Sequence, residues 1–167
     1  LYDIILATKP SEAFRDRLGL LPVIPKMFKS GRLGRKVGLG FYRYETPDGP
    51  AIPDPDVREM IDPYVRKRIA ISLDEIQDRI FLAVLLDAAR VVEDGIVSDV
   101  RDIDTGIVFG LGFPRFRGGI LYWGDTLGAG RILEMAKPLE HLGARFHPPD
   151  LLIDMAREGR KFYDAVK

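Results

Sequence analysis

The residues best suited to do chemistry form a basic, glycine-rich segment at residues 34–42, which ends in the aromatic pair Phe41-Tyr42. Its three glycines leave backbone amides open to an anion, and its adjacent arginine and lysine supply positive charge. It lacks, however, the preceding apolar strand and the closing Lys-Ser or Lys-Thr pair of a phosphate-binding loop. A tight turn with glycines at positive φ, and with the aromatic pair buried in the core, is therefore the favoured prediction. If the segment also binds the phosphates of a long ligand, the expected contacts are Arg35, Lys36, Gly38 and Gly40.

A second glycine-bounded segment spans residues 110–119 and carries Arg115 and Arg117 just before two glycines. A helix that starts after those glycines would offer free amides, so an anion could bind there. An ion pair of either arginine with Asp104 or Asp125 is the favoured alternative.

The acidic residues and histidines form no catalytic group. Asp102 and Asp104 are two positions apart and do not share a helix face, so they are a poor acid–base pair. Backbone groups or Arg117 are expected to hold the Asp104 carboxylate instead. The two histidines, His141 and His147, lack both the partners of a catalytic triad and the further ligands of a metal site. We predict no catalytic, cofactor-binding or metal-binding residue in this sequence.

Composition narrows the class of protein. The 167 residues include 25 basic and 25 acidic side chains, a balance that argues against a nucleic-acid-binding or membrane-binding surface. Cysteine is absent, which excludes disulfides and fits a reducing compartment. No apolar run approaches the ~20 residues of a membrane span. We expect a cytoplasmic location of the bacterial type, with mitochondria and peroxisomes left open.

The strongest local pattern is a helix at residues 73–93. Ser72 and Glu75 have the spacing of a capping box, and Gly95 stands where a left-handed C-terminal residue is wanted. Apolar residues at three- and four-residue spacing predict one buried stripe. Its members are Ile76, Ile80, Ala83, Val84, Ala88 and Val91.

Further helices follow. Ser98 is expected to cap a helix that stops near Gly110, and another begins at Gly118-Gly119. Residues 127–142 form a helix that Pro138 kinks or breaks. Pro149 occupies the first position of a last helix that runs through Ala156. Strand evidence is thin, although residues 37–44 could be extended. The predicted fold class is all-α.

Two stretches of the chain share an order of features that predicts an internal duplication of about 125 residues. Each has Leu-Gly, a proline six residues later, an apolar helix, Gly-Arg-Lys and Phe-Tyr. The first stretch has these at Leu18-Gly19, Pro25, Gly34-Arg35-Lys36 and Phe41-Tyr42, and the second at Leu142-Gly143, Pro149, Gly159-Arg160-Lys161 and Phe162-Tyr163. Four prolines in residues 46–55 mark a connector. We predict the end of a first copy at 1–46, a connector at 47–64 and a second copy at 65–167.

These motifs resemble the helical C-terminal region of 3-hydroxyacyl-CoA dehydrogenases. The resemblance is closest to the α subunits of multifunctional fatty acid oxidation enzymes, in which that region is duplicated. Residues 24–44 resemble the end of the first copy and residues 72–163 the second, with Gly-Phe-Pro-x-Phe-Arg-Gly-Gly at 112–119 as the most specific turn. The resemblance implies a helical fold like the C-terminal domain of 6-phosphogluconate dehydrogenase.

The resemblance also implies a function for the parent protein, which would oxidise 3-hydroxyacyl-CoA to 3-oxoacyl-CoA in fatty acid β-oxidation. NAD and the catalytic His-Glu pair would belong to a Rossmann domain whose Gly-x-Gly-x-x-Gly motif is missing here. Residues 1–6 resemble the middle of a helix, so we expect this chain to be a piece of a longer polypeptide. We expect the piece to be inactive alone and to form a homodimer. In the parent protein it would form one wall of the acyl-CoA cleft. Expected partners are the NAD-binding domain, with a hydratase domain and a thiolase subunit left open. The alternative is a non-enzymatic helical interaction module.

Overall fold

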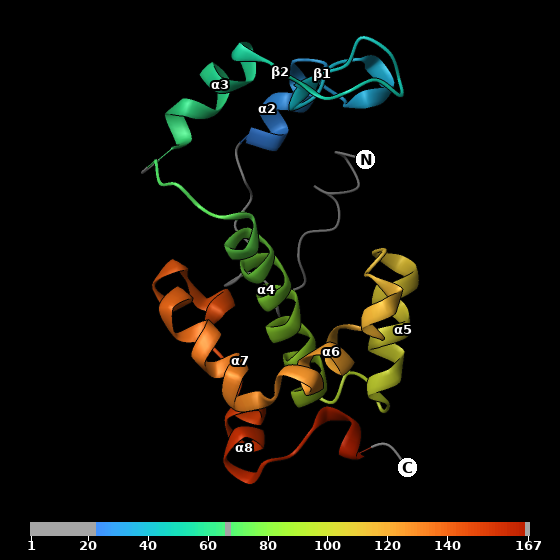
Figure 1. Cartoon of the computed structure of the whole chain (residues 1–167), viewed down its shortest axis with the longest axis vertical. Coiled ribbons are helices and arrows are strands. Elements are labelled where there is room, and N and C mark those ends of the chain that lie inside the picture. The colour runs from blue at the N-terminus through green and yellow to red at the C-terminus, as the bar shows by residue number, and fades with distance from the viewer. Residues whose placement is uncertain (1–22, 66–67, 166–167) are drawn as a thin grey trace. The chain divides into compact units, whose positions relative to one another are not determined.

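The computed structural model describes residues 23–65 and 68–165, in two compact units that divide between Ala70 and Ile71 (Figure 1). The predicted mid-helix at residues 1–6 and the first Leu-Gly pair, Leu18-Gly19, lie outside the described residues.

The first unit is a small helical module with one short hairpin. Its elements are α2 (Val23–Lys29), η2 (Arg35–Val37), β1 (Tyr42–Arg43), β2 (Ile52–Pro53), α3 (Pro55–Ile61) and η3 (Asp62–Tyr64). The strands pair antiparallel, with Tyr42 opposite Pro53 and Arg43 opposite Ile52. Three buried side chains, Val23, Met27 and Val57, join α2 to α3.

The second unit is helical throughout. Its elements are α4 (Leu73–Glu93), α5 (Val100–Gly110), η4 (Arg115–Arg117), α6 (Ile120–Leu127), α7 (Ala129–Ala136), η5 (Lys137–Leu142), η6 (Ala144–Phe146), α8 (Asp150–Glu158) and η7 (Phe162–Ala165). The long helix α4 packs against α6, α7 and α8 (Figure 1). With one two-stranded hairpin in the described residues, the mostly helical structure confirms the all-α fold class. None of the described helices has the length and apolar character of a membrane span.

Helix α4 has the predicted bounds but buries a different face. The Ser72 side chain accepts the Glu75 amide at 3.1 Å, and Gly95 has φ 64°. The predicted stripe is correct only in part: Ala88 is buried at 6%, whereas Ile76 and Ile80 are 40% and 57% exposed. The fully buried residues of the helix are Leu82, Leu85, Leu86 and Ala89. Two apolar faces satisfy the same period, and only the neighbouring helices decide which one is covered.

Three predicted helix boundaries shift for identifiable reasons. Asp99, not Ser98, caps α5, since its carboxylate accepts the Arg101 amide at 2.9 Å. Pro149 is the N-cap of α8 rather than its first residue. The predicted helix 127–142 is divided into α7, which Gly128 precedes at φ 83°, and the 3₁₀ segment η5 that contains Pro138.

The assignment of residues 1–46, 47–64 and 65–167 to two copies and a connector stays a prediction. Residues 47–64 are more than a linker, because they contain β2 and α3. The Asp54 side chain caps α3 by accepting the Asp56 amide at 3.2 Å. This segment therefore belongs structurally to the first unit.

The structure also changes the register of the internal repeat. The amide after Gly31 donates to Met27 O at 3.0 Å, and the amide after Gly159 donates to Met155 O at 3.0 Å. Both glycines are left-handed, at φ 74° and φ 68°. Gly31, and not Gly34, is thus the counterpart of Gly159, because each ends a helix in the same way.

Candidate functional site

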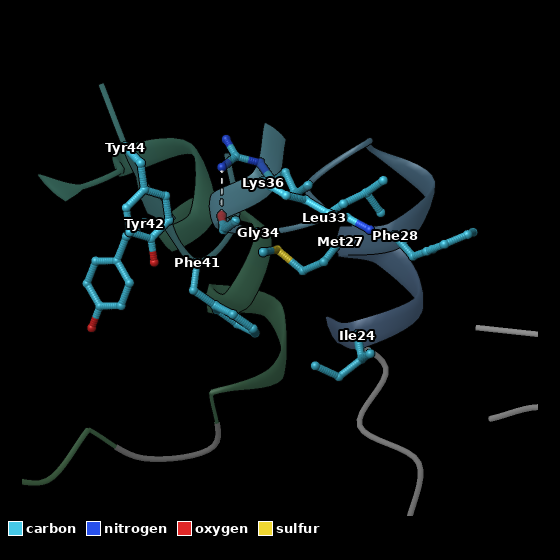
Figure 2. A pocket seen from close by; sticks show the side chains of 11 residues that line it. Ile24, Met27, Phe28, Leu33, Gly34, Lys36, Phe41, Tyr42 and Tyr44 are labelled. Atoms are coloured by element: carbon cyan, nitrogen blue, oxygen red, sulfur yellow. Dashed lines mark hydrogen bonds between the residues drawn. The ribbon is translucent and has the colours of Figure 1, made fainter. Parts of the chain in front are cut away.

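The candidate site is a pocket of about 530 Å³ within the first unit, between α2 and the glycine loop, residues 34–42. Ile24, Met27 and Phe41 contribute apolar surface, and Lys36 supplies a cation. Figure 2 shows the Met27 side chain and the Phe41 ring directed into the hollow between the loop and the helix. The pocket therefore combines an apolar floor with two cationic side chains, Lys36 and Arg32.

The shape of the glycine loop depends on glycines at three positions. Gly34 and Gly38 have positive φ values of 97° and 71°, as the turn prediction required. The Gly34 amide donates to Leu39 O at 2.9 Å, which closes the loop. Gly40 is needed for another reason, since a Cβ there would lie 2.8 Å from Gly34 Cα. The two ends of the loop touch backbone to backbone.

A buried ion pair holds this loop, and the sequence did not reveal it. Arg32 Nη1 donates to Gly40 O at 3.1 Å and to Asp54 Oδ2 at 2.9 Å. Both side chains are buried, with exposed fractions of 6% and 0%. The hydrogen bond from Arg32 is the main cause that lowers the pKa of the Asp54 carboxyl, so the acid is charged at neutral pH.

The predicted ligand contacts separate into two pairs. Arg35 Nη1 donates to Pro47 O at 2.9 Å and Gly49 O at 2.7 Å, and its guanidinium stacks on the Tyr44 ring. These contacts tie the loop to the proline-rich segment. Lys36 and Gly40 line the pocket, whereas Arg35 and Gly38 do not. Ligand binding by any of the four stays a prediction.

The aromatic pair of the glycine loop is not in the core, so that part of the turn prediction is wrong. Phe41 and Tyr42 are 46% and 47% exposed. The described residues place no helix over them comparable to the one that covers the second aromatic pair.

In the second unit, Asp104 fastens the start of α6. Its carboxylate accepts the Leu121 amide at 2.8 Å, the Tyr122 amide at 2.9 Å and the Tyr163 hydroxyl at 2.8 Å. Backbone groups thus hold Asp104, one of the two predicted alternatives. Burial, with the bond to Asp104, raises the pKa of Tyr163. Gly119, at φ 141°, is required because a Cβ there would lie 2.1 Å from Asp104 Cγ.

Asp125 likewise accepts backbone amides, in its case at the end of the described chain. It accepts the amides of Phe162 and Tyr163 at 2.8 and 3.0 Å. Burial raises the pKa of this carboxyl, against the lowering effect of the two amides. Phe162 is buried, at 4% exposed. The second aromatic pair is therefore fixed by carboxylates that lie far from it in sequence.

The two arginines of segment 110–119 bind aromatic rings. Arg117 Cζ lies 5.4 Å from the Trp123 ring centre and 5.6 Å from that of Phe116, while Arg115 Cζ lies 5.4 Å from that of Phe109. Within the described ranges neither arginine forms an ion pair, so the predicted pairing with Asp104 or Asp125 is wrong. Cation–π contacts replace it.

Both histidines lie on the surface of the second unit, and His141 Nδ1 is 2.9 Å from Pro138 O. In the part of the chain that the structure describes, no three His, Cys, Asp or Glu side chains are grouped to hold a metal ion.

Comparison with known proteins places the chain in a family. Residues 76–165 match the family described as "3-hydroxyacyl-CoA dehydrogenase, C-terminal domain". The matched range contains α5 to α8 and most of α4. This chain therefore belongs to the family of 3-hydroxyacyl-CoA dehydrogenase C-terminal domains.

Similar proteins extend the likeness to most of the chain. A "Fatty acid oxidation complex subunit alpha" from Pseudomonas paraeruginosa is 34% identical over 158 residues, and one from Pseudomonas savastanoi pv. phaseolicola is 35% identical over 159. Each match covers 92% of this chain but 22% of the relative's length. The crystal structure of the dehydrogenase part of multifunctional enzyme 1 from C. elegans has a similar fold, with a TM-score of 0.58 at 21% identity; the match covers 92% of this chain and 36% of that one.

Proposed function

We propose that this chain is the helical part of an NAD-dependent 3-hydroxyacyl-CoA dehydrogenase of fatty acid β-oxidation. The match of residues 76–165 to that dehydrogenase domain carries the proposal. It favours a part of an enzyme over the alternative of a non-enzymatic interaction module.

In this proposal the described residues support the reaction without performing it. NAD and the reacting atoms belong to a further domain of the parent, and a hydratase domain and a thiolase subunit are proposed partners. The helical units form one wall of the acyl-CoA cleft. We further propose a cytoplasmic location and a homodimer of the isolated chain.

Within that wall, Lys36 is the proposed contact for a substrate phosphate. It lies at the pocket, and among the described residues its ammonium group has no hydrogen-bond or ion-pair partner. Arg35 is less suited, because its Nη1 already serves two carbonyl oxygens. A single exposed cation contributes modestly to phosphate binding, about 0.2–1 kcal/mol.

The test uses the full natural polypeptide that contains this chain. With NAD and a 3-hydroxyacyl-CoA it should form NADH, whereas the 167-residue chain alone should form none. Lys36→Ala in the full polypeptide should raise KM for acyl-CoA about 2–5-fold and leave KM unchanged for a thioester without phosphates. Lys29→Ala, an exposed lysine outside the pocket, is the matched control. A full polypeptide that forms no NADH would contradict the proposed activity, and an unchanged KM would contradict the role of Lys36 alone.

A further inference from the structure

The pocket of the first unit offers aromatic rings to a ligand. Figure 2 shows the Phe41 ring directed into the hollow, and Tyr42 and Tyr44 line the same pocket. Phe41 and Tyr42 are 46% and 47% exposed. Stacking a second planar ring on such a face removes apolar area of both partners from water. The pocket is therefore suited to a ligand with a flat ring.

The backbone around Phe41 is held in place by hydrogen bonds. The carbonyl of Gly40 accepts Arg32 Nη1 at 3.1 Å, from a side chain that is 6% exposed. The Gly40 amide donates to Tyr42 O at 2.9 Å. Groups that are already fixed lose less conformational entropy when a ligand binds. The ring of Phe41 thus starts from a backbone position that binding does not have to create.

The charges that line the pocket favour an anion. Arg32 and Lys36 are among the lining residues, which include no aspartate or glutamate. Arg32 is paired with Asp54 at 2.9 Å, whereas among the described residues Lys36 has no hydrogen-bond or ion-pair partner. Lys36 and Phe41 belong to the same glycine loop. A fitting ligand therefore carries a negative charge close to its flat ring.

We propose that the pocket binds the 3′-phosphoadenosine end of coenzyme A, with the adenine ring on Phe41 and the 3′-phosphate on Lys36. The choice of coenzyme A rests on the function proposed above. The pocket volume of about 530 Å³ is in the range of small-molecule sites. An acyl chain would use the apolar floor but would leave Lys36 without a partner. Adenine with a phosphate uses both.

The first experiment titrates the 167-residue chain with adenosine 3′,5′-bisphosphate and follows the NMR signals of residues 34–42. Phe41→Ala should raise Kd at least about 5-fold, as expected for loss of one stacked base. Phe41→Tyr keeps the ring and should bind like wild type. Phe116→Ala, which removes an exposed ring of the second unit, is the control. Equal Kd values for wild type and Phe41→Ala would overturn the proposal.

A second set of titrations separates the parts of the ligand and its possible sources. Lys36→Ala should weaken binding of the bisphosphate about 2–5-fold and leave binding of adenosine, which has no phosphate, unchanged. NAD contains adenine but no 3′-phosphate, so it should bind more weakly than the bisphosphate. Tighter binding of NAD would assign the pocket to the cofactor, and displacement of the bisphosphate by decanoate would assign it to an acyl chain. Either result would overturn the proposal.

These titrations do not depend on turnover, so the two proposals can fail separately. If the full natural polypeptide forms NADH but the bisphosphate does not shift the signals of the loop, the assignment of the pocket is wrong and the proposed activity stands. If the bisphosphate binds as expected but the full polypeptide forms no NADH, the proposed activity is wrong and the adenine site stands.

Discussion

The two units contain the same local motif, a helix that ends at glycine and leads to Phe-Tyr, yet they hold it differently. Phe162 is buried and its amide bonds to Asp125, while Phe41 is 46% exposed beside an open pocket. The first unit uses instead an ion pair beneath the loop, Arg32 with Asp54. The local sequence thus determines where the helix ends, but the burial of the aromatic pair depends on a carboxylate and a helix from elsewhere in the sequence.

The largest difference between the two units is expected in the free energy of unfolding when Asp104 is replaced. Asp104→Ala leaves one buried amide, one partly buried amide and a tyrosine hydroxyl without their acceptor, which should destabilise the second unit by about 2–4 kcal/mol. Urea unfolding followed by fluorescence of Trp123, the single tryptophan of the chain, measures this unit alone. Asp102→Ala, an exposed acid on the same helix, should change the free energy of unfolding little. Equal stability of the two variants would contradict a capping role.

A smaller effect is expected from Gly40→Val in the first unit. A side chain there would push against Gly34, where the Cβ approach is 2.8 Å, at a cost of about 1–3 kcal/mol. Hydrogen exchange of residues 34–44 should speed up, while the unfolding midpoint from Trp123 should stay the same. Gly110→Ala, at a position with no neighbour within 4 Å, is the control. Unaltered exchange in Gly40→Val would show that the loop does not need its close backbone contact.

The smallest expected effect is the loss of the ion pair between Arg32 and Asp54 in acid. The pKa of Asp54 is lowered in the folded chain, so its stabilisation is complete above the unfolded pKa of about 3.9 and is lost as pH falls through the folded value. NMR signals of the glycine loop should therefore weaken in acid below about pH 4. Asp54→Asn should weaken them at neutral pH and remove this acid step, unlike Asp48→Asn in the exposed loop. If the NMR signals of Asp54→Asn still weaken in acid, a group other than Asp54 causes the weakening.

Local signals predicted much of the helical fold. The bounds of α4 followed from its hydroxyl cap, its period and Gly95, all of which act within a few residues. The buried face of α4 did not follow, because Leu82 and Leu85 were selected by packing with other helices. Tertiary neighbours decide between two apolar faces, and a single sequence does not name those neighbours.

The candidate site was predicted only in part. Glycine content pointed to the loop, and Gly34 and Gly38 do have positive φ. Arg32 and Asp54 were missed, since they lie 22 residues apart and nothing in either local sequence signals an ion pair. The register of the repeat was also predicted wrongly. The identical Gly-Arg-Lys sequence favoured Gly34 as the match, whereas the geometry of the helix end identifies Gly31.

One feature of the second unit constrains how its sequence can vary. The Asp104 carboxylate occupies the volume that a side chain at position 119 would fill. Any residue larger than glycine there would displace the acid, and loss of the acid would leave the first amides of α6 without their acceptor. A side chain at Gly119 is therefore compatible with this fold only if the residue at position 104 also changes, whereas Gly119 sets no such condition on Asp104.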